Sequence, residues 1–107
     1  MAMIRSLGNT QCVVANATSQ LLTFQSTLSL LVTSVESTAF VTVGTANTIT
    51  AATPAPGSAT SSIPVAAGWP QIFSTGQQFN QDPGPVYIAI VGSGNVFVSP
   101  VEDYNDN

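Results

Sequence analysis

Apolar and polar residues alternate along much of the chain with a period of two, which is the pattern of a strand that buries one face. In residues 27–33, for example, Leu28, Leu30 and Val32 fall on the same face of such a strand. The alternating segments are rich in Val, Thr, Ile and Phe, which favour the pleated surface of a sheet. Together these features predict strands at residues 11–15, 20–24, 27–33, 38–43, 48–52 and 71–74.

Two further apolar runs near the C-terminus, residues 85–91 and 95–99, flank the glycine-rich segment 92–94. Glycine reaches the positive φ angles that tight hairpin loops need, so the two runs predict a β-hairpin. From Val86 to Val91 every position is apolar or aromatic, so this strand is apolar on both faces. We therefore expect it to be central in its sheet or to be covered by another chain.

A helix is the alternative for the segment between residues 21 and 35. Five apolar residues in it follow one another at spacings of three and four: Leu21, Phe24, Leu28, Leu31 and Val35. This spacing would place one apolar stripe along a helix. The segment is also rich in Ser, Thr and Val and poor in Ala, Glu, Lys and Arg, the residues that favour helices. We therefore expect strands here.

Two segments between the predicted strands have the composition of loops. Residues 53–62 consist mainly of Pro, Ala, Gly, Ser and Thr, and Pro54 and Pro56 lack the N–H group that a sheet ladder needs. This length predicts a long crossover or an exposed tip rather than a hairpin turn. Residues 76–85 predict a second surface loop.

About eight short strands with turns between them predict an all-β fold, an antiparallel β-sandwich of jelly-roll or other Greek-key topology. The length of 107 residues suits a single domain. We expect residues 1–8 to form a flexible N-terminal arm, residues 9–101 the sandwich domain and residues 102–107 an acidic tail.

Charged residues make up 6% of the chain, against about 25% in ordinary soluble domains. The sequence has no Lys and no His, a single Arg (Arg5) and a single Cys (Cys12). A free monomer with so few charges lacks the repulsion that keeps proteins apart, so we expect much of its surface to be covered in an assembly. Cys12 lies in an apolar run, and we expect it to be a small core residue.

The net charge of -4 with a single cation argues against direct binding of nucleic acid, because phosphate binding depends on clustered Lys and Arg. The chain has no run of about eighteen apolar residues, so the sequence predicts no membrane span. The N-terminal residues lack the apolar core of a signal peptide, so we expect synthesis in a cytoplasm.

The inventory of reactive side chains argues against an enzyme. Without His, neither a Ser-His-Asp triad nor a histidine-based zinc site can form, and without Lys there is no Schiff-base chemistry. The five carboxylates fall in predicted loops or near the C-terminus, where solvated charges explain them better than a paired acid and base: Glu36, Asp82, Glu102, Asp103 and Asp106. Asp103, Asn105 and Asn107 match the start of a calcium-binding loop, but the required Gly and Glu do not follow. We therefore expect no catalytic residue, no cofactor and no metal site.

Eight residues are candidates for contacts with other molecules. Trp69, between Gly68 and Pro70, could stack on a sugar, anchor an interface or cap the core. Phe79 and Tyr87 are expected at the core or at an interface. Met3, Ile4 and Arg5 in the arm, and Pro54 and Pro56 in the loop, are the residues that we expect to reach neighbouring subunits.

Four segments followed by an acidic end carry a family resemblance: residues 39–44 (AFVTVG), 62–68 (SIPVAAG), 87–90 (YIAI) and 94–98 (GNVFV). This succession resembles small jelly-roll proteins of tailed-bacteriophage particles, most of which are capsid decoration or cement proteins. The resemblance implies a virion protein on the capsid exterior, a homodimer or homotrimer that binds the major capsid protein or another shell protein without chemistry. The alternatives are a carbohydrate-binding sandwich that uses Trp69 and Tyr87, and a head-fibre or tail component.

Overall fold

The structure is a computed structural model and describes residues 2–76 and 84–105. These residues form nine strands: β1 (Ala2–Ser6), β2 (Gln11–Ala15), β3 (Gln20–Phe24), β4 (Ser29–Ser34), β5 (Ala39–Gly44), β6 (Ile63–Val65), β7 (Gln71–Ser74), β8 (Val86–Val91) and β9 (Gly94–Asn105). The helix alternative for residues 21–35 is wrong, because that segment forms β3 and β4. Within the described ranges there is no helix of the length and hydropathy needed to cross a membrane.

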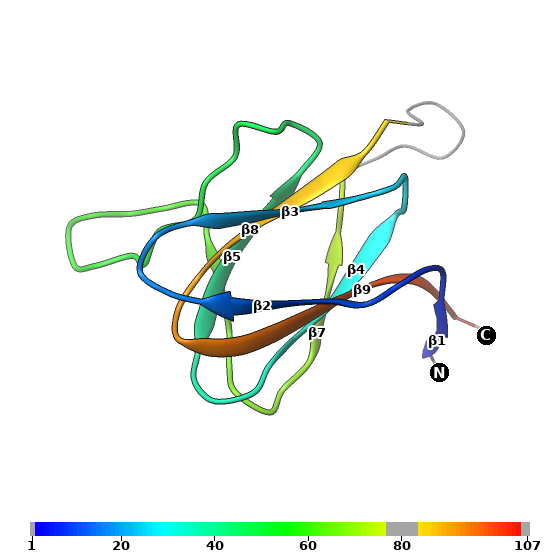
Figure 1. The fold of residues 1–107 in the computed structure, drawn as a ribbon, viewed down its shortest axis with the longest axis horizontal. Coiled ribbons are helices and arrows are strands. Elements are labelled where there is room, and N and C mark those ends of the chain that lie inside the picture. The colour runs from blue at the N-terminus through cyan, green and yellow to red at the C-terminus, as the bar shows by residue number, and fades with distance from the viewer. Residues whose placement is uncertain (1, 77–83, 106–107) are drawn as a thin grey trace.

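The strands form two antiparallel sheets that pack face to face (Figure 1). In the first, here called the β9 sheet, the order is β2-β9-β4-β7, and β1 pairs with β9 beyond the end of β2. In the second, the β8 sheet, the order is β3-β8-β5-β6. The predicted all-β antiparallel sandwich is therefore confirmed.

The pairing of the strands is nested. β2 pairs with β9, β3 with β8, β4 with β7 and β5 with β6, all antiparallel. A long antiparallel hairpin that is rolled up on itself gives these pairs, and the β4–β9 and β5–β8 pairs then complete the two sheets. This is the topology of an eight-stranded jelly roll, to which β1 is added.

The predicted hairpin between residues 85–91 and 95–99 is wrong. β8 and β9 do not pair with each other, because β8 lies between β3 and β5 while β9 lies between β2 and β4. Residues 92–94 instead carry the chain from one sheet to the other. The β2–β3 connection turns the same corner beside them, and Gly92 N donates a hydrogen bond to Asn16 O at 3.0 Å. A glycine-rich segment serves such a corner as well as it serves a hairpin loop.

The core lies between the sheets and consists almost entirely of aliphatic side chains. It contains Ala15, Phe24, Leu30, Val32, Ala39, Val41, Val65, Phe73, Val86, Ile88, Ile90, Val96 and Val98. β8 is central in its sheet, as its sequence predicts. Its other face, with Ala89 and Val91, packs against Ala51 and the half-buried Ile49. The cover on that face is therefore a loop of the same chain.

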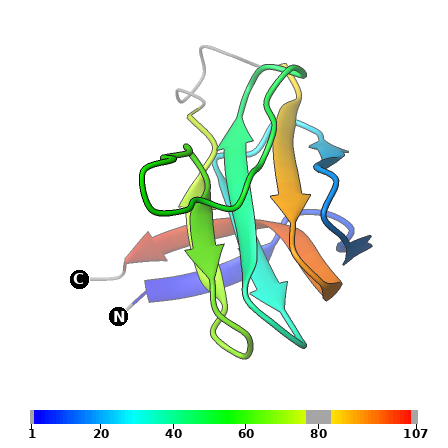
Figure 2. The same ribbon diagram turned by 90° about the vertical axis from the view of Figure 1, so that its left-hand side faces the viewer.

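The covering loop spans residues 45–62 and lies in front of the β8 sheet in Figure 2. The strand predicted at residues 48–52 is wrong, since Ile49 and Ala51 use their apolar side chains to cover β8 rather than to extend a sheet. Ala51 N donates to Ser19 Oγ at 2.9 Å, which fixes the loop to the β2–β3 connection. Residues 53–62 form a loop, as predicted, with one isolated bridge between Ala55 and Ser58.

The two ends of the chain form a ribbon that extends from the β9 sheet, seen at the right of Figure 1. We call β1 and its partner segment Val101–Asn105 the terminal ribbon. The sequence predicts a flexible arm and a separate acidic tail here, whereas the structure pairs the two. β9 continues past the sandwich, and Arg5 Nη2 lies 2.5 Å from Glu102 Oε1 on the neighbouring strand. The single cation of the chain thus offsets part of the acidity of its C-terminal segment.

Candidate functional site

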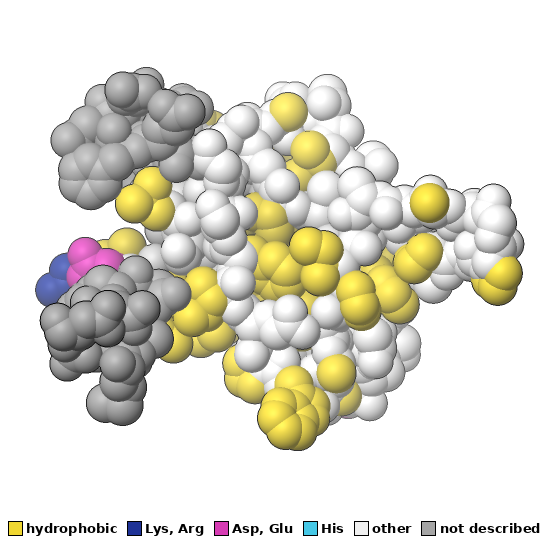
Figure 3. Space-filling view, turned by 180° about the vertical axis from the view of Figure 1, so that it is seen from behind, with side chains coloured by type: hydrophobic (Ala, Val, Ile, Leu, Met, Phe, Trp, Pro, Cys, Tyr) yellow, Lys and Arg dark blue, Asp and Glu magenta, His cyan; other side chains and the backbone are white. Residues whose placement is uncertain are grey.

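The body of the sandwich carries almost no charge. Between Ser6 and Val101 the sequence has two charged residues, Glu36 and Asp82, and Asp82 lies outside the described residues. Glu36 Oε1 accepts a hydrogen bond from Asn95 N at 3.4 Å. On the face drawn in Figure 3, the basic side chain (dark blue) and the acidic side chain (magenta) lie together at one end. The rest of the described surface on this face is apolar or neutral. The terminal ribbon, with Arg5 and Glu102, accounts for that pair.

The outer face of the β9 sheet presents apolar side chains from four strands. Successive side chains of a strand point to opposite faces of the sheet. The core-facing residues are Val13, Leu30, Val32 and Phe73, so their neighbours face outward. The outward set, here called the outer patch, consists of Cys12, Val14, Leu31, Val35, Ile72 and Phe97. Among these Val14 is 65% exposed, Val35 51% and Phe97 38%. The patch is therefore an accessible apolar surface rather than part of the core.

Strand register places the residues of the outer patch on neighbouring strands of one face, with the polar Thr33, Asn95 and Ser99 among them. Cys12 pairs with Phe97, and Leu31 pairs with Ile72. Val14 pairs with Asn95, whose carbonyl accepts a hydrogen bond from Val35 N at 3.1 Å. These pairs join β2, β9, β4 and β7 across the width of the sheet.

The prediction that Cys12 is a core residue is wrong, because Cys12 is exposed. Its neighbour Val13 packs against the core instead. Both residues are apolar, so the sequence pattern alone did not distinguish the inward from the outward position. In the structure the Cys12 side chain belongs to the outer patch.

The polar neighbours of the outer patch are hydroxyl and amide groups and one carboxylate, that of Glu36, which follows Val35 in the chain and accepts a hydrogen bond from Asn95 N. The Thr10 and Ser99 hydroxyls lie 2.6 Å apart, and Thr33 pairs with Phe97 from the side opposite Cys12. The six residues of the outer patch carry no charge, so burying them against a partner avoids the cost of removing side-chain charges from water. By contrast, the outer face of the β8 sheet is partly covered by residues 45–62.

Trp69 stands on a tight turn at one end of the sandwich. Trp69 N donates to Ala66 O at 3.1 Å, and Gly68, with φ of 78°, donates its N–H to Ser34 O at 3.0 Å. The indole is 72% exposed, so the interpretation of Trp69 as a core-capping residue is wrong. The bond to Ser34 places this turn next to Val35 of the outer patch.

The other predicted contact residues lie apart from the outer patch. Tyr87 is half-buried in β8, between Thr23 and Gly44 in register. Gly44 ends β5, whereas Val65, just before the Trp69 turn, pairs with Ala39 at the start of β5, so Trp69 and Tyr87 do not form a common platform.

Pro54 and Pro56 are exposed in the loop 45–62, and Ile4 and Arg5 are exposed in the terminal ribbon. Met3 lies in β1 opposite Tyr104 in register. Phe79 lies outside the described residues.

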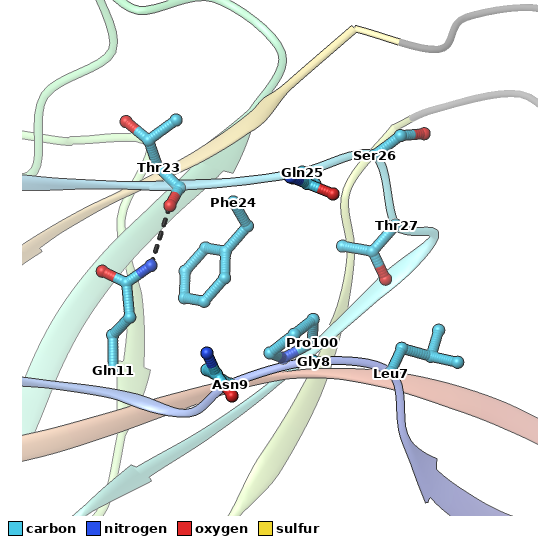
Figure 4. A pocket seen from close by; sticks show the side chains of 10 residues that line it. All are labelled: Leu7, Gly8, Asn9, Gln11, Thr23, Phe24, Gln25, Ser26, Thr27 and Pro100. Atoms are coloured by element: carbon cyan, nitrogen blue, oxygen red, sulfur yellow. Dashed lines mark hydrogen bonds between the residues drawn. The ribbon is translucent and has the colours of Figure 1, made fainter.

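An open pocket of about 380 Å³ lies between the chain entering β2 and the β3–β4 turn (Figure 4). Its apolar lining consists of Leu7, Phe24 and Pro100, and its polar lining of Asn, Gln, Ser and Thr side chains. Gln11 Nε2 crosses one side of it to donate to Thr23 O at 2.8 Å. Because no ionisable side chain lines the pocket, its lining provides no general acid, general base or charged ligand.

The remaining described residues do not assemble a reactive group either. Among them, no three Asp, Glu, Cys or His side chains come together, and no buried side-chain nitrogen or oxygen lacks a partner. The exposed, uncharged outer patch is therefore the best candidate for a functional surface. Comparisons with protein-family models, with curated proteins and with solved structures find no match for this chain.

Proposed function

We propose that this protein is a non-enzymatic structural protein of a bacteriophage particle, a decoration or cement protein that binds the outside of the capsid shell. The observation that carries the proposal is the exposed, uncharged outer patch on a jelly-roll body. A shell protein is the partner, and the outer patch is the face that lies against it.

The size of the molecule is compatible with such a contact. A standard specific interface buries about 800 Å² on each partner, which is about an eighth of the accessible surface of 6196 Å². Apolar side chains supply the driving force, because area removed from water stabilises a contact by about 25 cal/mol per Å² before the costs of association. A lattice repeats the contact many times, so each contact can be modest and still reinforce the shell.

Other candidate residues extend the contact beyond the outer patch. Trp69, next to Val35, provides an aromatic anchor at one end of the patch. The loop that carries Pro54 and Pro56, and the terminal ribbon with Met3, Ile4 and Arg5, reach neighbouring subunits in this proposal. A head-fibre or tail component would use the same surfaces on another part of the particle.

Sedimentation with candidate phage shells tests the proposal, combined with light scattering of the protein alone. The proposal predicts a discrete dimer or trimer in solution that pellets with shells. A well-behaved monomer that stays in the supernatant with every shell would contradict it.

A carbohydrate-binding module is the second candidate, and the exposure of Trp69 is the observation that favours it. An indole held on a tight turn can stack on a sugar ring. This function predicts that Trp69→Ala abolishes glycan binding and leaves the fold intact. Because Tyr87 lies elsewhere, Tyr87→Ala should not change binding, and a glycan array without hits would count against this candidate.

A further inference from the structure

Edge strands expose N–H and C=O groups that can pair with another chain. In the body of this sandwich, a glutamine side chain occupies one carbonyl on each of three edge strands, β2, β3 and β6. On the β2/β3 side, Gln11 Nε2 donates to Thr23 O at 2.8 Å and Gln20 Nε2 donates to Val14 O at 3.0 Å. On the β6/β7 side, Gln71 Nε2 donates to Pro64 O at 3.2 Å, and Pro64 itself has no N–H. Each glutamine links the two sheets and occupies a carbonyl of an edge strand.

Within the described residues, no such side-chain hydrogen bond occupies a backbone group on the outer side of β1 in the terminal ribbon. Leu7 N donates to Pro100 O at 2.9 Å, and the register continues through Arg5 opposite Glu102. In an antiparallel pair, hydrogen-bonded and non-hydrogen-bonded positions alternate. Residues 3 and 5 therefore direct their N–H and C=O groups toward β9, whereas Ile4 and Ser6 direct theirs away from it.

An isolated two-stranded ribbon is marginally stable in water, and pairing with a third strand stabilises it. Ile4 is also 50% exposed at the middle of β1. Both features favour pairing of the free edge of β1 with a further strand.

We propose that β1 pairs with β1 of a second copy of this chain, antiparallel, about a two-fold axis at Ile4. In this arrangement the outward N–H and C=O groups of Ile4 bond those of Ile4 in the second copy. Residue 2 of each copy exchanges hydrogen bonds with residue 6 of the other. All three residues have an N–H to donate. A second copy fits this edge because an antiparallel edge centred on one residue is complementary to itself.

The charges of the ribbon allow this pairing. Arg5 would lie opposite Met3 of the second copy rather than opposite another Arg5, and it keeps its ion pair with Glu102. The Asp103 positions, in register with Ile4, would be three strand spacings apart, about 14 Å. That distance exceeds the Debye length of about 10 Å at 0.1 M salt, so repulsion between them is largely screened.

The test is the mass of the purified full chain by sedimentation velocity over a range of concentrations, with Ile4→Pro and Ile4→Val as a matched pair. Ile4→Pro removes the outward N–H without removing a bond to β9, and proline is tolerated at edge positions of this kind. Ile4→Val keeps the N–H and the branched side chain. We expect a wild-type dimer of twice 11.0 kDa, an Ile4→Val dimer, and a dissociation constant raised at least about tenfold by Ile4→Pro.

Amide hydrogen exchange provides the second measurement, because it measures the protection of the individual N–H groups on the outer edge of β1. The Ile4 and Ser6 amides should gain protection as the wild-type protein is concentrated, while unchanged far-UV circular dichroism shows that the sandwich of Ile4→Pro remains folded. A wild-type monomer, a trimer, or an Ile4→Pro dimer as tight as the wild type would overturn the pairing. These measurements use no particle, so their outcome is independent of shell binding.

Discussion

A Cβ atom added at Gly92 would lie 3.1 Å from the Cα atom of Ala39, so the corner between β8 and β9 packs directly against the backbone at the start of β5. The same Cβ would lie 3.3 Å from Thr38 O. Neither neighbour is the end of a flexible side chain, so neither can move away cheaply. The corner where the chain passes from the β8 sheet to the β9 sheet is therefore tightly packed.

Gly92→Ala should therefore lower the free energy of unfolding by about 1–3 kcal/mol, because the added Cβ overpacks the corner and because the φ of 153° at Gly92 is one that L residues rarely adopt. Gly44→Ala, at the other end of β5, is the matched control, since its Cβ would meet Ile49 Cγ2 at an ordinary 3.6 Å. That variant should be neutral or stabilising by up to about 1 kcal/mol. Urea denaturation measures both, and equal losses would show that the corner is not tightly packed.

The glutamine contacts between the sheets should contribute measurably to stability. Gln11→Ala and Gln20→Ala each remove a side-chain hydrogen bond to the opposite sheet and should each lower the free energy of unfolding by about 0.5–1.5 kcal/mol. The exposed Gln25 is the control, and Gln25→Ala should change stability by less than about 0.5 kcal/mol. Thermal or urea unfolding checks this, and indistinguishable stabilities for all three variants would argue against the contacts.

The loop that covers the β8 sheet depends on the bond between Ala51 N and Ser19 Oγ. Ser19→Ala should leave this N–H without its partner beside the buried Ala51, and hydrogen exchange at Ala51 should become faster. Ser58→Ala in the same loop is the control, because Ser58 bonds Ala55 through backbone atoms alone. An Ala51 amide equally protected in both variants would contradict this role of Ser19.

Shell binding should be nearly insensitive to salt, because the outer patch has no charged side chain. Between about 0.05 M and 0.5 M NaCl we expect the fraction that pellets with shells to stay constant within about twofold. If the charged residues of the terminal ribbon, Arg5 and Glu102, supplied most of the binding energy instead, binding would fall steeply over the same range. Sedimentation at several salt concentrations distinguishes the two.

The sequence predicted the strands whose alternation is clear and the central position of β8, because its run from Val86 to Val91 is apolar on both faces. It did not predict the partner of that strand. Glycines at positions 92 and 94 suit a hairpin and a sheet-to-sheet corner equally, and only long-range pairing with β2 and β3 decides between them.

The sequence predicted a surface with few charges but not the outer patch, none of whose six residues is among the eight predicted contact residues. The scarcity of charge indicated a covered surface, but Cys12 and Val14 are as apolar as Val13, so the sequence did not show which of them face outward. The terminal ribbon was missed because its two strands come from opposite ends of the chain. The one local signal was a single Arg near one end and acidic residues at the other.

The most direct test of the proposed function compares Val14→Asp with Thr23→Asp in sedimentation with phage shells. Both positions are exposed on edge strands, but Val14 lies in the outer patch and Thr23 lies on the β8 sheet. The proposal predicts that the wild type and Thr23→Asp pellet with the shells, whereas Val14→Asp, folded by circular dichroism, stays in the supernatant. Pelleting of Val14→Asp to the same extent as the wild type would contradict the assignment of the outer patch as the shell-binding face.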